Sequence, residues 1–330
     1  MLTTKWNIAP ISPLFMPDDH DILELRPAKK NLDPFKPYHY LHEEEVDAIG
    51  TIKTVNTLFL TNKECPFKCT MCDLWKHTLD SPTPQGAIPQ QINYALDLLP
   101  KASVVKLYNN GNFFDTGAIP PADYPAIAKQ LQGIERVVVE NHPKLCNDRC
   151  LEFAELLDGK LEIALGLETI HPEVLPKLNK QITTDNFRKA VSFLISNDIA
   201  TRAFILLNPP YLTDDKENIE WTVRSIAFAF EAGVQTCSII PTRAGNGIMD
   251  KLKENGKFVP PTLPALESAF EESMKMEKGR VFVDLWDLEH FSTCEVCFTK
   301  RKARLEKMNM TQKIQPRVNC PVSCKQNGMI

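Results

Sequence analysis

The sequence lacks a long hydrophobic run. No apolar stretch approaches the ~18 residues that a membrane-spanning helix needs, so we expect no membrane partner. The first 17 residues contain scattered prolines and no continuous apolar stretch, so we expect no signal peptide. Histidine is scarce too, with seven in 330 residues, and this disfavours a histidine-rich zinc hydrolase.

Cysteine, in contrast, is abundant, with ten residues. A hydrophobic fraction of 43% is enough to build a sizeable core without disulfide bonds. Without an export signal we expect the chain in the cytoplasm, where thiols stay reduced and serve metal binding or catalysis. The length allows about two domains, or one barrel with an appendage.

The order of short apolar runs and helical patterns predicts an α/β fold. Residues 1–50 are rich in proline and charge without a sustained period, which indicates an extended arm packed on a core. Six strands and five helices alternate after it, and a further helix and strand follow near the C-terminus. The expected strands are Thr54–Thr61, Val104–Asn109, Arg136–Glu140, Leu161–Leu167, Thr201–Leu207, Gln235–Pro241 and Arg280–Leu285. The expected helices are Pro89–Leu99, Pro121–Leu131, Asp148–Leu157, Asp185–Ser196, Asp215–Ala232 and Leu263–Lys278.

Near-continuous apolar strands between helices indicate a parallel sheet that is covered by helices. Right-handed crossovers wind such a sheet into a full or partial TIM-type barrel, here a partial (βα)6 barrel. An open doubly wound sheet is the alternative. The expected organisation is an arm over 1–50, the barrel over 51–260 and a cysteine-bearing extension over 261–330.

Three cysteines follow the first strand of the βα series, in the spacing Cys65-x3-Cys69-x2-Cys72. Three close thiolates suit an iron–sulfur cube, whose irons each take one soft sulfur ligand. A cube with three protein ligands leaves its fourth iron open to bind something external. Zinc is the alternative, but it ordinarily takes a fourth nearby ligand, and His77 lies at an unusual spacing for that role.

This motif and its position resemble the radical S-adenosylmethionine (SAM) superfamily, whose members carry it after the first strand of a partial barrel. The resemblance implies that SAM binds the open iron and that an electron from the reduced cluster breaks it into methionine and a 5′-deoxyadenosyl radical. That radical would abstract hydrogen from a small-molecule or carrier-bound substrate. The resemblance also implies an external electron donor such as flavodoxin or ferredoxin.

Further positions are similar to SAM-contacting positions of that superfamily. They lie at strand ends or in the turn Tyr108–Phe113, except one at the start of its strand, Arg202. The candidate SAM-binding residues are Asn110, Gly111, Asn112, Glu140, Glu168, Arg202 and Ile240. An ion-pair network is the alternative for the three charged ones, and no catalytic residue is assigned.

The strand endings, such as Gly166-Leu-Glu168-Thr169, are similar to those of archaeosine-forming radical SAM enzymes and the elongator catalytic subunit. This similarity makes modification of a tRNA or nucleobase an alternative function. A segment with eight basic residues and one acid, 300–325, fits a bound phosphate or anionic cofactor, but equally a solvated helix face. The whole chain carries −4 and this segment carries +7, so the rest of the chain carries about −11. Such an acidic body repels phosphate, so nucleic acid is not the favoured partner.

Four cysteines lie near the C-terminus, in two pairs that flank a basic helical stretch. They are Cys294, Cys297, Cys320 and Cys324. In a chain that resembles radical SAM enzymes they look like an auxiliary 4Fe–4S site, the second of two expected clusters, which would donate sulfur or relay electrons. A structural zinc site is the alternative, and with it a non-catalytic scaffold. The remaining cysteines, Cys146, Cys150 and Cys237, are expected to pack as small apolar residues, with ligation as the alternative.

Overall fold

The computed structural model describes residues 17–320 and residue 322, so Cys324 lies outside the described residues. Its strands are β1 (His39–Val46), β2 (Ile52–Phe59), β3 (Val104–Tyr108), β4 (Arg136–Asn141), β5 (Lys160–Glu168), β6 (Ala200–Leu207), β7 (Thr236–Pro241) and β8 (Arg280–Val283). Its α-helices are α1 (Asp19–Glu24), α2 (Ala87–Leu98), α3 (Tyr124–Gln130), α4 (Asp148–Leu156), α5 (Val174–Lys177), α6 (Thr184–Ser196), α7 (Asp215–Glu231), α8 (Ile248–Glu254), α9 (Leu263–Met274) and α10 (Glu295–Thr311). Short 3₁₀ helices are η1 (Leu74–His77), η2 (Pro121–Asp123), η3 (Pro143–Leu145) and η4 (Leu288–Phe291).

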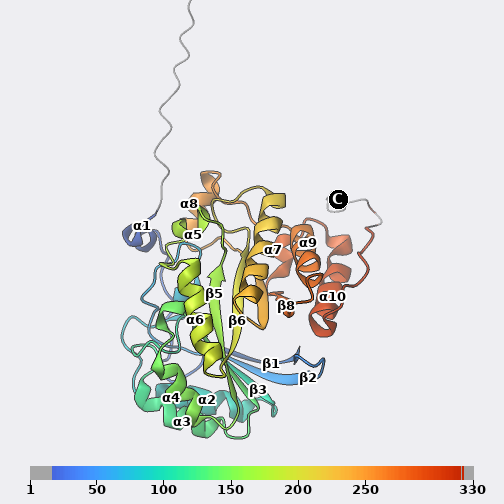
Figure 1. Ribbon diagram of the computed structural model, residues 1–330. Helices are drawn as coiled ribbons and strands as arrows, with labels where there is room; N and C mark the ends of the chain where they lie inside the picture. Colours follow the sequence, from blue (N-terminus) through green and yellow to red (C-terminus); the bar gives the residue numbers. More distant parts are fainter. Residues whose placement is uncertain (1–16, 321, 323–330) are drawn as a thin grey trace, which may run out of the picture.

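The eight strands form one sheet in which the spatial order follows the sequence from β1 to β8. β1 pairs antiparallel with β2, and β2 through β8 run parallel. The sheet curls into a partial TIM-type barrel with helices along its outside (Figure 1). The expected fold class is confirmed, and the doubly wound alternative is wrong, because the strand order never reverses.

The edge strand β1 was not predicted from the sequence. It comes from the segment expected to be only an arm, and its register places His39 opposite Phe59 and Val46 opposite Ile52. Its partly buried residues are Tyr40 and Leu41, which are adjacent, and the two acids Glu43 and Glu45. The strand therefore has no hydrophobic alternation, which is the usual signal of a half-buried strand.

The two faces of the barrel wall differ in chemistry. Alternate residues of β5, such as Ile163 and Leu165, face outward into the main core, together with helix residues such as Phe153 of α4 and Phe187 of α6. The intervening residues face the interior, beginning with the buried acid Glu162. Outside, α10 contacts both edge strands, β1 and β8, and so covers the side where the barrel is open.

Side-chain caps decide where the main helices begin. Thr183 accepts a hydrogen bond from the backbone N–H of Asn186 at 3.1 Å, which forms a capping box at the start of α6. The Asp214 side chain caps α7 by accepting a hydrogen bond from the backbone N–H of Glu217 at 2.8 Å. The crossover helices are thereby fixed at the end of the loops that connect them to the mouth of the barrel.

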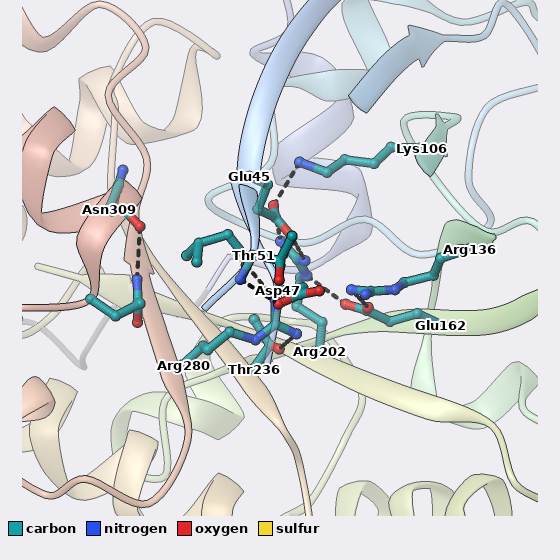
Figure 2. A network of polar contacts seen from close by, with 12 residues as sticks. Glu45, Asp47, Thr51, Lys106, Arg136, Glu162, Arg202, Thr236, Arg280 and Asn309 are labelled. Atoms are coloured by element: carbon teal, nitrogen blue, oxygen red, sulfur yellow. Dashed lines mark hydrogen bonds and ion pairs between the residues drawn. The ribbon is translucent and has the colours of Figure 1, made fainter. Parts of the chain in front are cut away.

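Charged residues fill the base of the barrel, the end where the parallel strands begin (Figure 2). The Arg202 guanidinium donates to Glu162 Oε1 at 2.8 Å and to both carboxylate oxygens of Glu45 at 2.6 and 3.0 Å. Lys106 lies 2.9 Å from Glu45, and Arg136 lies 3.4 Å from Glu162. Burial raises the pKa of the Glu45 carboxyl, but Arg202 and Lys106 outweigh it and hold that pKa well below its ordinary value.

None of the helices within residues 17–320 combines the length and apolar character that crossing a membrane requires.

Candidate active site

The loop after β2 brings its three cysteines to the mouth of the barrel, the end where the parallel strands finish. Leu60 N–H, at the start of this loop, donates to the carbonyl of Tyr108 at the end of β3, at 2.7 Å. The loop turns tightly at its end, where Cys72 N–H donates to the Cys69 carbonyl at 3.1 Å. Cys69 is buried, and Cys65 is partly buried. Carboxyl ends of barrel strands are the common position of active sites in this architecture.

Neighbouring loops hold the backbone of the cysteine loop. Thr70 N–H donates to the carbonyl of Leu178, after α5, at 2.9 Å. The Asn246 amide, after β7, donates to the carbonyls of Thr70 and Cys72 at 2.9 and 3.0 Å. These partners lie more than 100 residues along the chain from the loop, so the whole barrel mouth contributes to its position.

The turn after β3 contacts the first cysteine. Asn112 Nδ2 donates to Cys65 Sγ at 3.1 Å. A Cβ atom on Gly111 would lie 3.3 Å from the Cβ of Cys65, so glycine permits this close approach. Asn110 has a left-handed backbone, with φ of 52°, and accepts a hydrogen bond from Tyr38 Oη at 2.8 Å. The structure therefore brings Gly111 and Asn112 to the cysteine loop, with Asn110 beside them in the same turn.

Glu140, at the end of β4, holds the same turn. Its carboxylate accepts hydrogen bonds from Asn109 N–H at 2.7 Å and from Gly111 N–H at 3.4 Å. Burial raises the pKa of this carboxyl to about 7, although the backbone donors favour its charged form. Glu140 thus lies at the mouth as expected, where its carboxylate positions backbone.

Glu168 ends β5 beside a lysine that the sequence analysis missed. Lys180 Nζ lies 2.8 Å from Glu168 Oε1, and both residues are buried. Burial lowers the Lys180 pKa, but Glu168, Cys69 and Cys65 outweigh it and keep that pKa above its ordinary value. A Cβ on Gly166 would lie 2.3 Å from the Glu168 carboxylate and 2.6 Å from Lys180 Nζ, so glycine leaves room for this arrangement of the pair. Lys180 lies outside every motif, and no local signal identifies it.

Two further candidates lie in different surroundings. Ile240 packs against an apolar cluster around Leu178 and Leu206, which Met71 of the cysteine loop also contacts. Arg202 lies in the first half of β6, at the base, where both edges of its guanidinium bind carboxylates. Ile240 and Met71 therefore pack against the same apolar cluster, whereas Arg202 lies at the base, where the ion-pair alternative describes its position.

The donor set of the loop fits a metal cluster. Burial raises the pKa of the Cys69 thiol to about 12 and raises those of Cys65 and Cys72, which also interact with one another electrostatically. Three closely placed thiols, one buried and two partly buried, that disfavour each other's charge need a bound cation to become thiolates together. The sulfur atoms of Cys65, Cys69 and Cys72 do not all lie within 4.8 Å of one another, whereas those of Cys294, Cys297 and Cys320 do.

Several of the buried polar atoms without a protein partner lie near the same end of the barrel, and others, such as Tyr124 Oη and Ser273 Oγ, lie elsewhere. Among the described residues, those near this end include the Oγ1 atoms of Thr61 and Thr242, both side-chain heteroatoms of Asn109, and Asn208 Oδ1. These residues directly follow β2, β7, β3 and β6, respectively, or come within two positions of the strand end. Buried polar groups are normally satisfied by protein, water or ligand. The atoms at the strand ends are suited to a mouth that accepts a polar molecule.

The described tail cysteines form a second, separate set. Sγ atoms of Cys294, Cys297 and Cys320 all lie within 4.8 Å of one another, and those of Cys294 and Cys320 are 3.8 Å apart. The fourth expected member, Cys324, lies outside the described residues. Cys150 and Cys237 are fully buried in the main core, and Cys146 packs partly against it.

Acids of α9 take up part of the charge of the basic segment. Arg301 and Arg304 are buried and pair with Glu267, and Arg304 also pairs with Glu271. Arg317 lies 2.9 Å from Glu271. The segment is therefore not a uniformly open basic face, and its arginines anchor it to the barrel.

Comparisons with known proteins agree with the fold. No family model matches the chain. An uncharacterized protein, MJ0550, of Methanocaldococcus jannaschii is 24% identical over 320 residues, which cover 90% of this chain and 87% of that protein. The crystal structure of Streptococcus suis SuiB is similar with a TM-score of 0.52 and 14% identity, over 71% of this chain and 49% of that one.

The coproporphyrinogen III oxidase HemN of Escherichia coli, a radical SAM enzyme, is similar with a TM-score of 0.47 and 12% identity. The similarity covers 67% of this chain and 52% of HemN. The chain thus spans about half the length of both solved structures. The likeness to SuiB supports the partial-barrel fold.

Proposed function

We propose that this chain is a radical SAM enzyme. The observation that carries the proposal is the convergence of Cys65, Cys69 and Cys72 at the barrel mouth, on a loop that the turn after β3 and the loop after β7 hold in place. When bound there, a 4Fe–4S cluster with SAM supplies an electron and a 5′-deoxyadenosyl radical that abstracts hydrogen from an organic substrate.

The chain's own residues hold, orient and shield these groups. Asn112 donates to the Cys65 sulfur and thereby favours its thiolate, and Lys180 adds positive charge beside Cys65 and Cys69. Burial of Cys69 and Lys180 excludes water from the site. We assign SAM contacts to the mouth residues, namely Asn110, Gly111, Asn112, Glu168 and Ile240, with Glu140 acting through the backbone of the turn.

Such a reaction needs a one-electron donor, and a flavodoxin or ferredoxin in the cytoplasm is the proposed partner. The substrate is proposed to be a small or carrier-bound organic molecule that meets the unsatisfied polar groups at the mouth. Pairing of Arg301, Arg304 and Arg317 with acids of α9 leaves less basic surface for a tRNA.

The test is anaerobic reconstitution with iron and sulfide, followed by dithionite and SAM, with 5′-deoxyadenosine measured over time. We expect its formation by the wild type and its loss, at least 100-fold, in Cys69→Ala. The matched control is Cys146→Ala, which removes a partly buried thiol outside both cysteine groups and is expected to retain activity. Wild-type protein that binds iron but forms no 5′-deoxyadenosine would contradict the proposal and favour a cluster-stabilised scaffold.

A further inference from the structure

The tail cysteines do not have the spacing of an iron–sulfur cube. Each thiolate of a 4Fe–4S cluster binds a different corner iron, which keeps the sulfurs about 6 Å apart. A single tetrahedral zinc ion with Zn–S bonds of about 2.3 Å brings them to about 3.8 Å. Here Cys294 Sγ and Cys320 Sγ are 3.8 Å apart, and Cys297 Sγ lies within 4.8 Å of both. The set is too close for the expected auxiliary cluster and matches one ion.

The three sulfurs come from two separate parts of the chain. Cys294 directly precedes α10, Cys297 lies in its first turn, and Cys320 approaches from 26 residues further along. All three are buried and form a small cluster of their own with Val318. Because three sulfurs meet rather than two, one disulfide bond would leave a buried thiol beside it.

The start of α10 suits negatively charged sulfur. α10 is 17 residues long, and the N–H groups and dipole at its N-terminus stabilise anions beside Cys294 and Cys297. Ser292 Oγ accepts a hydrogen bond from Cys294 N–H at 3.3 Å, which holds the backbone of Cys294 directly before α10. The Cys-x2-Cys spacing at a helix start is typical of structural zinc sites.

We infer that Cys294, Cys297 and Cys320 bind a single zinc ion that serves a structural role. The ion ties the segment after α10 back to the helix start, and the pairs that Arg304 and Arg317 form with Glu271 hold the same region to α9. Zinc carries no redox chemistry, so this site neither donates sulfur nor relays electrons.

The decisive experiment measures metal in a variant without the loop thiols, Cys65→Ala/Cys69→Ala/Cys72→Ala. The full-length protein is purified anaerobically from medium that contains both iron and zinc, without reconstitution. We expect about one zinc per chain and no iron, because only the tail site remains. About four irons per chain would overturn the inference, as would the absence of both metals. Since the loop motif is missing throughout, the result does not depend on SAM cleavage.

A second comparison assigns the ion to the tail. Adding Cys294→Ala and Cys320→Ala to the same variant should remove the zinc, whereas adding Cys146→Ala and Cys150→Ala should leave it. Zinc that survives the tail substitutions would overturn the assignment.

A measurement on the wild-type chain avoids any effect of substitution on folding. Removing the ion with a chelator should release the segment after α10 and raise tryptic cleavage after Lys313 and Arg317, both exposed, about 10-fold. Refilling with Co²⁺ should restore protection and give the visible absorption of tetrahedral thiolate-bound cobalt. Cleavage that is unchanged by the chelator, or cobalt without that absorption, would count against the site.

Discussion

The base and the mouth of the barrel use buried charge in opposite ways. At the base, Glu45 and Glu162 are surrounded by Arg202, Lys106 and Arg136, and the pKa values of both carboxyls are lowered (Figure 2). At the mouth, burial raises the pKa of Glu140 to about 7 and the pKa of the Cys69 thiol to about 12. The base has its charges matched within the protein, whereas the mouth retains groups that a ligand can satisfy.

This difference separates a structural task from a chemical one. Arg202 connects β6 to Glu45 on β1, so the network ties the antiparallel edge strand to the parallel barrel. At the mouth, in contrast, the polar groups and thiols lie on loops that are connected to one another by hydrogen bonds. At the base the buried charges are paired with one another, so removing one leaves its partner uncompensated. At the mouth the pairing is incomplete, and a cation and a polar cofactor can complete it.

The largest effect on stability is expected from Arg202→Met at the base. The variant leaves Glu45 and Glu162 without their shared cation, and uncompensated buried charge costs about 3–5 kcal/mol of unfolding free energy. Urea denaturation of the metal-free protein measures it. Arg224→Met, which breaks an exposed pair with Glu220, is the control and should cost less than about 1 kcal/mol. Equal losses in the two variants would contradict the structural role of the base.

The next effect is the pH dependence of Glu140→Gln. The folded-state pKa of Glu140 is about 7, above the ordinary 4.5, so wild-type folding favours the protonated carboxyl. That stability is present below pH 4.5 and is lost as pH rises towards 7, by about 3 kcal/mol at most. We therefore expect Glu140→Gln to gain stability relative to wild type from pH 4.5 to 7. A difference between the two proteins that is constant with pH would show that Glu140 is not titrating there.

A smaller stability effect, with a larger effect on activity, is expected for Lys180→Met at the mouth. The variant leaves Glu168 buried without its partner and should cost about 3 kcal/mol, the low end for a buried pair because a single carboxylate is affected. It also removes the positive charge beside Cys65 and Cys69, so 5′-deoxyadenosine formation should fall about 10-fold or more. Lys180→Arg retains the charge and should recover part of the rate. Full activity in Lys180→Met, measured at equal iron content, would show that the Lys180 charge has no role in the reaction.

The smallest effect is expected from Gly111→Ala. The new methyl group would lie 3.3 Å from the Cys65 Cβ, a tight contact that a small shift of the turn relieves. We expect a loss of about 1 kcal/mol and less than a twofold drop in iron content. Complete loss of iron would show that the turn fixes the cysteine loop more rigidly than the distances imply.

The sequence predicted the six parallel strands β2 to β7, and with them the position of the cysteine loop at the barrel mouth. Strand periodicity, helix patterns and the Cys65–Cys72 spacing are local properties that a short stretch of chain carries by itself. The strand β1 escaped prediction because its partly buried side chains include Glu43 and Glu45, which resemble solvent-facing residues until their partners are known.

The tertiary structure alone decided which charges and thiols meet. Arg202 was expected at the site, but it pairs with Glu45, 157 residues away, at the other end of the barrel. Lys180 joins the thiols from a loop without a motif, and Cys320 approaches Cys294 to a distance that favours one ion over a cube. Such contacts form between distant parts of the chain, so spacing determined which residues are able to bind metal, and packing determined how far apart their sulfurs lie.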